Sequence, residues 1–209
     1  MKKIELDLKT GILLGLFCTL LLLGNLLGSK VITIFGIITS VGIFSYPVSF
    51  LITDIVAEVK GKRTSQMFVY IGFVCLLVAL GYTFLSLVFP PASIYEHNPE
   101  YSTVFSNSIR VILASLTAFF FSQIHDVWAF HFWKRKTNGK FLWLRNNLST
   151  IVSQLIDTII FMFIAYYMVS PKFTVSNIII MIIPYWLLKV SIAILDTPFV
   201  YLGVRWLKK

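Results

Sequence analysis

The chain has 209 residues, of which 57% are hydrophobic and 13% are charged. Soluble domains are roughly 45–50% apolar and about 25% charged, so this composition excludes a water-soluble globular protein and indicates a chain solvated by lipid. The net charge of +9 does not indicate nucleic-acid binding, because the basic residues form short clusters between apolar runs, which is the pattern of membrane topology signals.

Six stretches contain the ~20 predominantly apolar residues that a membrane-spanning helix needs. The first follows a basic N-terminus, as a signal peptide would, but it continues without an A-x-A-like cleavage site, so we interpret it as a helix. Residues 1–209 are therefore predicted to form one all-α, polytopic transmembrane domain. The predicted spans are approximately 11–31, 40–59, 66–89, 107–132, 146–169 and 176–205.

The segments between these spans differ strongly in charge. Six spans place both termini on one side, which receives thirteen of the 18 Lys and Arg residues, whereas the other side receives two, Lys30 and Lys172. Because basic residues are enriched in cytoplasmic loops, both termini are predicted to be cytoplasmic, in a multi-pass protein of the inner (cytoplasmic) cell membrane.

The first two spans carry polar residues that are costly in a bilayer. The Asn25 amide both donates and accepts hydrogen bonds, so it could bind the polar edge of a ligand. A hydrogen bond between two helices is an equally good interpretation. Asp54 and Glu58 share one helix face. Asp54 lies about one turn deeper and is the better site candidate, whereas Glu58 could belong to a solvated helix end. Pro47 can kink this span and free backbone groups for a cavity.

The fourth and fifth spans each contain a glutamine and an aspartate at i, i+3, so that an amide and a carboxylate stand on one helix face. The two pairs could converge on one cavity, where they suit a ligand with adjacent N–H donors, such as the edge of guanine. The alternative is a polar clamp between the two helices, with Arg110 or Arg145 as counter-ions. The pairs are Gln123 with Asp126 and Gln154 with Asp157.

Three basic residues lie within spans or at their ends. Arg110 and Arg145 lie near span ends and could extend to the interface. Lys189 lies near the middle of the last span and is expected to pair with a carboxylate. Pro198, in Asp196-Thr197-Pro198, is expected to interrupt the same span, as in the discontinuous helices of transporters.

Signatures of an enzyme or a metal site are missing from the sequence. It has no H-E-x-x-H, no G-x-S-x-G and no phosphate-binding glycine loop, and His125 and His131 are too few for a metal centre. No catalytic residue and no metal ligand is therefore predicted. Four aromatic residues of the fourth span could stack on a flat heterocycle, although contact with lipid is the better interpretation for them: Phe119, Phe120, Phe121 and Trp128.

Several blocks of residues, in order along nearly the whole chain, resemble the queuosine precursor transporter family, which was formerly named for vitamin uptake. The block in the fifth span is the most specific. The blocks are Asn25 with Lys30; Pro47 followed by Asp54-x-x-x-Glu58-x-x-Gly61; Arg110-x4-Ser115 followed by Ser122-Gln123-x-x-Asp126; Arg145-Asn146-Asn147-x-Ser149-Thr150-x-x-Ser153-Gln154-x-x-Asp157-Thr158; and Lys189 followed by Thr197-Pro198-x-x-Tyr201.

This resemblance implies uptake of 7-deazaguanine bases such as preQ0, preQ1 or queuine, which the cell uses for queuosine biosynthesis, a tRNA modification. The partners are then a small deazapurine and the lipid bilayer, without direct contact with nucleic acid, and a homo-oligomer stays open. The alternative is the substrate-binding membrane subunit of an ATP-driven vitamin-type uptake system, since the sequence has no ATP site of its own.

The ligand contacts follow from the same polar residues. Asp126, Gln154 and Asp157 are predicted to contact the substrate. No cofactor is expected, and proton coupling through an aspartate, Asp54 or Asp126, is a hypothesis. The supporting residues of the predicted binding site are Asn25, Asp54, Arg110, Gln123, Arg145 and Lys189.

Overall fold

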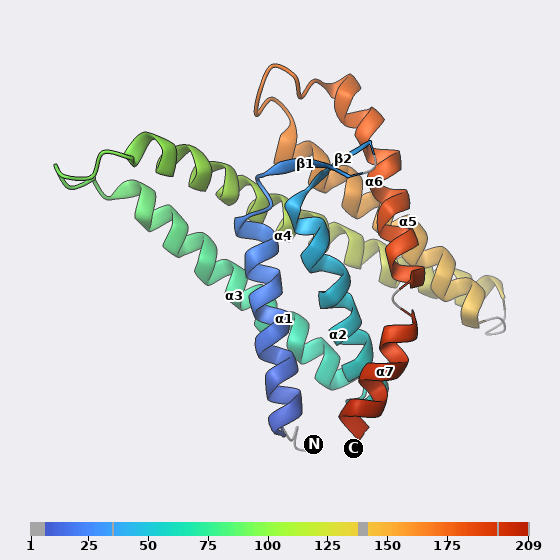
Figure 1. Ribbon diagram of the computed structural model, residues 1–209. Coiled ribbons are helices and arrows are strands. Elements are labelled where there is room, and N and C mark those ends of the chain that lie inside the picture. The colour runs from blue at the N-terminus through green and yellow to red at the C-terminus, as the bar shows by residue number, and fades with distance from the viewer. Residues whose placement is uncertain (1–6, 35, 138–141, 196, 209) are drawn as a thin grey trace.

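The computed structural model describes residues 7–34, 36–137, 142–195 and 197–208. This part of the chain is mostly α-helical, with one short β-hairpin and a turn of 3-10 helix (Figure 1). In chain order the elements are α1 (Leu8–Leu26), β1 (Val31–Ile34), β2 (Ile37–Ser40), the 3-10 turn (Val41–Phe44), α2 (Ser45–Lys60), α3 (Lys62–Val88), α4 (Asn98–Lys136), α5 (Leu142–Tyr166), α6 (Val175–Leu195) and α7 (Thr197–Lys208).

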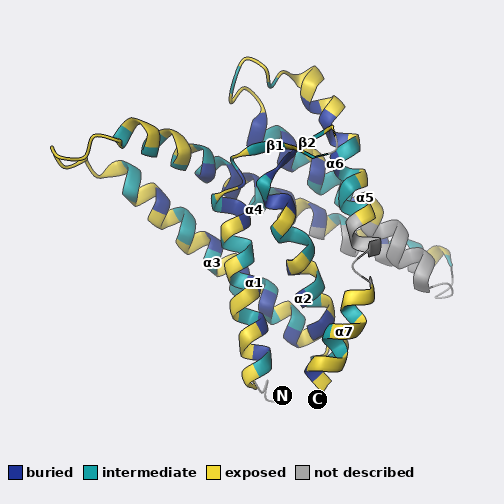
Figure 2. Cartoon of the chain, in the orientation of Figure 1, coloured by how far each residue is buried: buried dark blue, intermediate teal, exposed yellow. Residues whose placement is uncertain are grey.

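The helices confirm a multi-pass membrane protein. Four segments in the described ranges are long and apolar enough to cross a membrane, and two shorter apolar helices lie where the fifth and sixth spans are predicted. Exposed residues cover the outward faces of the helices (Figure 2), where lipid can solvate them. The four longer segments are Leu8–Leu26, Val41–Lys60, Arg63–Val88 and Asn98–Ser122, and the two shorter are Ile151–Tyr166 and Val175–Ser191.

The first predicted span, 11–31, is too long, because the helix ends at Leu26 and residues 27–30 form a turn that leads into a β-hairpin. The α1 helix ends at Leu26, and β1 pairs with β2 in antiparallel register from Val31↔Ser40 to Ile34↔Ile37. Both strands are rich in β-branched residues, which favour extended backbone. Gly36 follows β1 with φ +80, a backbone conformation that glycine adopts without strain. The all-α class is therefore confirmed, with one short hairpin added between α1 and α2.

Pro47 does not interrupt the α2 helix. Pro47 lies in the first turn of α2, which begins at Ser45 directly after the 3-10 turn. Backbone amides in the first turn of a helix have no acceptor within the helix, so a proline there breaks no hydrogen bond. A proline that does lie inside a helix is Pro184 in α6, which the sequence interpretation passed over.

The predicted sixth span is divided into two helices. The α6 helix ends at Leu195 and α7 begins at Thr197, so Pro198 occupies the first turn of a new helix, where its missing N–H is tolerated. Asp196 itself lies outside the described residues. The α7 helix packs against α2, where Gly203 faces Ile55.

Two hydrophobic clusters fill the interior. One, the hairpin-side cluster, joins α4, α5 and α6 near β1 and includes Val111, Phe161 and Tyr185. The other, the terminus-side cluster, joins α1, α2 and α3 with α7 and includes Phe17 and Phe68. The space between these clusters is where the bundle can hold a ligand.

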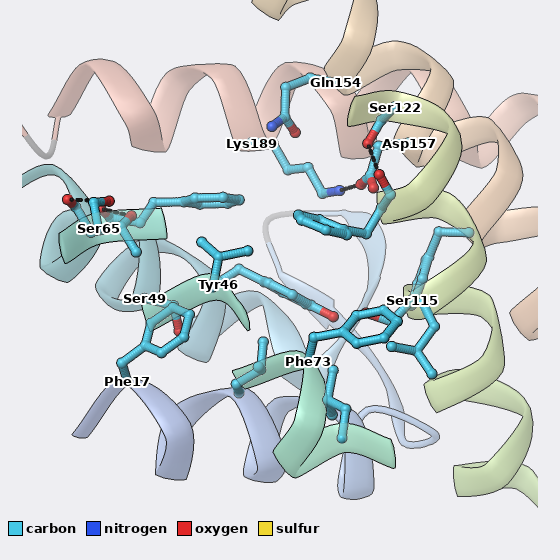
Figure 3. Close-up of a pocket in the computed structure, with 18 of the residues that line it drawn as sticks. Phe17, Tyr46, Ser49, Ser65, Phe73, Ser115, Ser122, Gln154, Asp157 and Lys189 are labelled. Carbon is cyan, nitrogen blue, oxygen red and sulfur yellow. Dashed lines mark hydrogen bonds and ion pairs between the residues drawn. The ribbon is translucent and has the colours of Figure 1, made fainter. Parts of the chain in front are cut away.

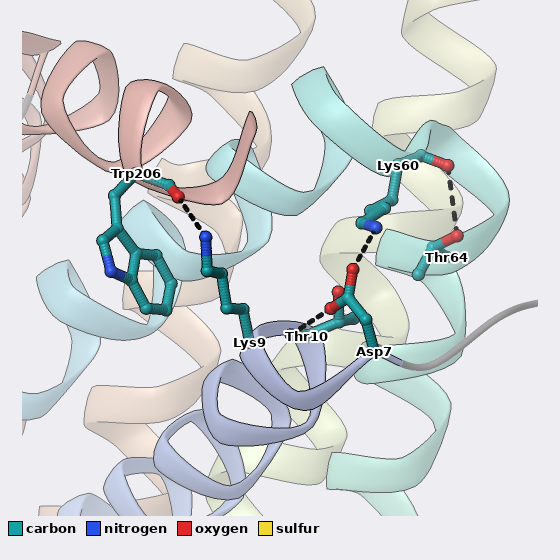
Figure 4. A network of polar contacts seen from close by, with 6 residues as sticks. All are labelled: Asp7, Lys9, Thr10, Lys60, Thr64 and Trp206. Atoms are coloured by element: carbon teal, nitrogen blue, oxygen red, sulfur yellow. Dashed lines mark hydrogen bonds and ion pairs between the residues drawn. The ribbon is translucent and has the colours of Figure 1, made fainter. Parts of the chain in front are cut away.

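The chain ends meet at one end of the bundle (Figure 1). Lys60 forms an ion pair with Asp7 at 2.5 Å, and the Lys9 ammonium donates to the Trp206 carbonyl at 3.1 Å (Figure 4). Three segments predicted to share one side of the membrane, namely the start of α1, the α2–α3 turn and the end of α7, therefore lie together. That this side is the cytoplasmic one stays a prediction.

Candidate functional site

A cavity of about 310 Å³ lies between the two hydrophobic clusters (Figure 3). Residues of both clusters form its wall, since Phe17 belongs to the terminus-side cluster and Phe161 and Tyr185 belong to the hairpin-side cluster. The helices α1 to α6 all contribute side chains. Small-molecule sites in proteins typically occupy about 300–1,000 Å³, so this cavity suits a small ligand.

An ion pair forms part of the cavity wall. The Lys189 ammonium on α6 lies 3.0 Å from Oδ2 of Asp157 on α5, and the two side chains are 14% and 25% exposed. The same ammonium lies 5.0 Å from the ring centre of Tyr185 and 5.9 Å from that of Tyr46. The pairing expected for Lys189 from its depth in the span is confirmed, and its partner is Asp157.

Helical spacing explains how these groups meet. Gln154 and Asp157 are three residues apart on α5, and Tyr185 and Lys189 are four apart on α6, so each pair shares a helix face. The α5 and α6 helices pack side by side around the hairpin-side cluster. Figure 3 shows Gln154, Asp157 and Lys189 on one side of the cavity and Phe17 and Phe73 across from them.

Hydroxyl groups form a second part of the wall. Ser49, Thr53 and Ser122 donate to carbonyls of their own helices, so each retains acceptor capacity for a ligand. The Tyr185 hydroxyl is fully buried and has no hydrogen-bond partner among the described residues. A buried hydroxyl without a partner is unfavourable, and a ligand polar group in the cavity can supply one.

Aromatic rings form much of the remaining wall and include Phe17, Phe50, Phe73, Phe119 and Phe161. Such faces bind flat rings by stacking.

Of the four aromatic residues considered from the sequence, Phe119 lines the cavity. Phe120, Phe121 and Trp128 are 58%, 50% and 58% exposed, in agreement with their interpretation as lipid-facing.

Three predicted site residues lie elsewhere. Asn25 is buried and donates to the Leu21 carbonyl, and its Oδ1 is unpaired among the described residues. Asp54 is exposed on α2, although its neighbour Thr53 lines the cavity. Arg110 donates to the Ile164 and Tyr167 carbonyls at the end of α5. The structure therefore places these three outside the cavity wall.

Three further predictions fall on side chains outside the described residues: Gln123, Asp126 and Arg145. The helix that carries the first two runs beside the cavity, because Ser122 lines it and His125 Nδ1 lies 3.0 Å from Ser153 Oγ on α5. Gln154 and Asp157 line the same cavity, and the convergence of the two Gln–Asp pairs stays a prediction.

Sequence reasoning missed the cavity's tyrosines and serines. Tyr46 and Ser115 come from α2 and α4, and the Tyr46 hydroxyl points toward Ser115 (Figure 3). A signal was available for Tyr185, because a tyrosine four residues before a buried lysine can place its ring against the ammonium. The described residues contain no group of three His, Cys, Asp or Glu side chains suited to hold a metal ion.

Comparisons with known proteins show the family of the chain. Residues 40–203 match the family described as "Putative vitamin uptake transporter". The chain is similar to the "Probable queuosine precursor transporter" of Bacillus subtilis (strain 168), with 34% identity over 178 residues, or 85% of this chain and 76% of that protein. It is also similar to the "Queuosine precursor transporter" of Escherichia coli (strain K12), with 27% identity over 143 residues, or 68% of this chain and 62% of that protein. No solved structure matches the chain.

Proposed function

This chain belongs to the queuosine precursor transporter family, and from that premise we propose that it imports 7-deazaguanine bases through the cavity between its two hydrophobic clusters. It is a transporter and not an enzyme, in keeping with the names of its relatives. The observation that carries the proposal is the convergence of Gln154, Asp157 and Lys189 in an aromatic cavity.

The edge of a guanine-like ring matches these side chains. It presents two adjacent N–H donors and a carbonyl acceptor. A carboxylate accepts from both donors, and an amide donates to the carbonyl while it keeps an acceptor of its own. We assign Asp157 to the donors and Gln154 to the carbonyl, with Oδ2 of Asp157 held by Lys189. The Tyr185 hydroxyl supplies a further polar contact.

The cavity also suits the shape of the base. A volume near the lower limit of known ligand sites fits one bicyclic ring better than a nucleoside or nucleotide. Phenylalanine side chains on several sides provide faces on which the ring stacks. The position of the cavity between two packed clusters fits alternating access, in which one end of the bundle closes as the other opens.

The test is rescue of tRNA queuosine in bacteria that lack both precursor synthesis and their own transporter. Expression of this chain, with preQ0, preQ1 or queuine at low concentration, is expected to restore queuosine; for queuine the host also carries a transglycosylase that accepts it. Asp157→Asn removes one charged hydrogen-bond acceptor, an effect of about 1.5–3 kcal/mol, so uptake is expected to fall by roughly 10- to 100-fold.

Glu100→Gln is the matched control, because it makes the same chemical change at the exposed start of α4, away from the cavity. Its uptake should equal that of the wild type. Normal uptake by Asp157→Asn at normal abundance would remove Asp157 from the site. Transport by the purified chain alone in liposomes would exclude the ATP-driven alternative. An uptake rate that is unchanged when the proton gradient is dissipated would exclude proton coupling.

A further inference from the structure

The two cysteines of the chain meet at the contact between α1 and α3. Cys18 lies near the middle of α1 and Cys75 near the middle of α3, and their thiols are within hydrogen-bonding reach of each other. Both thiols are free and partly exposed. Because the sequence contains no other cysteine, each thiol has the other as its one thiol neighbour within the chain.

A glycine brings the two helices together at this level. A Cβ atom built on Gly72 would lie 2.7 Å from Cε1 of Phe17 and 2.8 Å from Cδ2 of Leu21. Cys18 directly follows Phe17 in α1. Cys75 lies about one turn after Gly72, on the same side of α3. Small residues let helix backbones approach closely, and a disulfide needs such an approach, with Cα atoms about 4.4–6.8 Å apart.

The contact between α1 and α3 also forms one wall of the cavity. This wall is lined by Phe17 and Leu21 from α1 and by Phe73 and Leu76 from α3. Phe17 and Phe73 lie across the cavity from the ion pair of Lys189 (Figure 3). For a ligand to pass, the bundle has to open at one end as it closes at the other, so a covalent bond between α1 and α3 would hold this wall in one position.

We propose that Cys18 and Cys75 form a modification site, where a hydroperoxide dissolved in the membrane produces a disulfide that fixes α1 to α3 and stops transport. One thiol reduces the O–O bond and becomes a sulfenic acid, and an alcohol leaves. The second thiol attacks the sulfenic sulfur, water leaves, and the disulfide forms. Each sulfur atom loses one electron and the hydroperoxide accepts both. A reducing thiol reverses the bond by exchange.

The surroundings of the pair determine the class of oxidant. Cys18 packs against the terminus-side cluster, and apolar side chains beside the two cysteines, such as Leu16 and Val74, are exposed where lipid solvates the helices. A hydroperoxide with a hydrocarbon body enters this layer, whereas a charged oxidant stays in water. The inference goes beyond the proposed function, because the disulfide forms whatever molecule the cavity carries.

The experiment exposes the full-length chain, in membrane vesicles from transporter-deficient cells, to cumene hydroperoxide. Mass spectrometry of the digested protein is expected to find a peptide pair joined through Cys18 and Cys75, which dithiothreitol separates again. Uptake of labelled preQ0, preQ1 and queuine is measured in the same vesicles. It should fall in proportion to the cross-linked fraction and recover after dithiothreitol.

The double variant Cys75→Ala with Leu77→Cys is the matched control. It keeps two thiols, but a side chain two positions along a helix points to the opposite face, and Leu77 is 46% exposed. This variant and Cys18→Ala should form no bond within the chain, and their uptake should resist the hydroperoxide.

Absence of the joined peptides from the treated wild type overturns the site. Unchanged uptake by a fully cross-linked wild type, or an equal loss of uptake in Cys18→Ala, overturns the block of transport. A lack of uptake by the untreated wild type contradicts the proposed function instead, and the joined peptides then still decide whether the site exists.

Discussion

Two cations on membrane helices, Lys189 and Arg110, have different partners and therefore different roles. Lys189 pairs with a carboxylate in the cavity wall. Arg110 donates through Nε to the Ile164 carbonyl at 2.6 Å and through a terminal nitrogen to the Tyr167 carbonyl. Carbonyls at the end of a helix have no partner within it, and a cation there also interacts favourably with the helix dipole. Arg110 thus caps α5 from the neighbouring helix α4.

Arg110→Met is expected to lower stability and spare substrate recognition. The change removes charged hydrogen bonds to the end of α5, each worth about 1.5–3 kcal/mol, so thermal unfolding in detergent should begin at a clearly lower temperature. The concentration of precursor that half-saturates uptake should stay near the wild-type value. Arg205→Met, at an exposed position of α7, is the control for loss of a surface arginine. A large loss of affinity with normal stability would instead support the role in ligand binding that the sequence suggested.

Helices α2 and α7 pack closely because a glycine lies at their contact. A Cβ atom built on Gly203 would lie 2.1 Å from Cδ1 and 2.8 Å from Cγ1 of Ile55. Ile55 is 5% exposed and belongs to the terminus-side cluster, so it has little room to move. The absence of a side chain at this one position lets α7 pack closely against α2.

Gly203→Ala is therefore expected to destabilise the protein by about 1–3 kcal/mol, the usual effect of overpacking. Ile55→Val removes the Cδ1 atom that is closest to the new methyl group, so the double variant should be less destabilised than the sum of the single changes. Gly81→Ala is the matched control: no atom lies within 4 Å of a Cβ at that position, and alanine is the better helix former. Additive losses in the double variant would contradict the contact between α2 and α7.

At the scale of the whole molecule, polar contacts hold the chain ends together on one side of the cavity. Asp7 caps α1 by accepting from the Thr10 amide at 2.8 Å, and it also pairs with Lys60 at the end of α2. The Lys60 ammonium, followed by the Thr10 amide, holds the pKa of the Asp7 carboxyl well below its usual range. A folded-state pKa below the unfolded one means that the contact stabilises the fold while the carboxyl is ionised.

The contribution of Asp7 should therefore be complete above its unfolded pKa, about 3.9, and should be lost as the pH falls below that value. Asp7→Asn keeps a good helix cap and removes only the charge. Its unfolding temperature should lie slightly below that of the wild type at pH 7, and the difference should shrink at pH 3. A difference that is the same at both pH values would show that the ion pair does not stabilise the fold.

Composition and charge distribution by themselves predicted a multi-pass membrane protein, because the apolar surface of the whole chain has to be solvated by lipid. An apolar chain with clustered basic residues must place helices in lipid, wherever each residue lies. Local rules likewise predicted a carboxylate partner for Lys189. The same rules missed the hairpin, which lies almost entirely between the first two predicted spans, because the search was for apolar stretches of helix length.

The tertiary structure alone decided which polar residues share a site. Periodicity places Gln154 with Asp157 and Tyr185 with Lys189, since each pair lies within one helix. No sequence spacing within one helix predicts that α5 packs beside α6, or that Tyr46 on α2 lies near the Lys189 ammonium. The sequence could not separate Arg110 from Lys189 for the same reason: both are membrane cations, and the packing of neighbouring helices determines whether the partner is a helix end or the wall of a cavity.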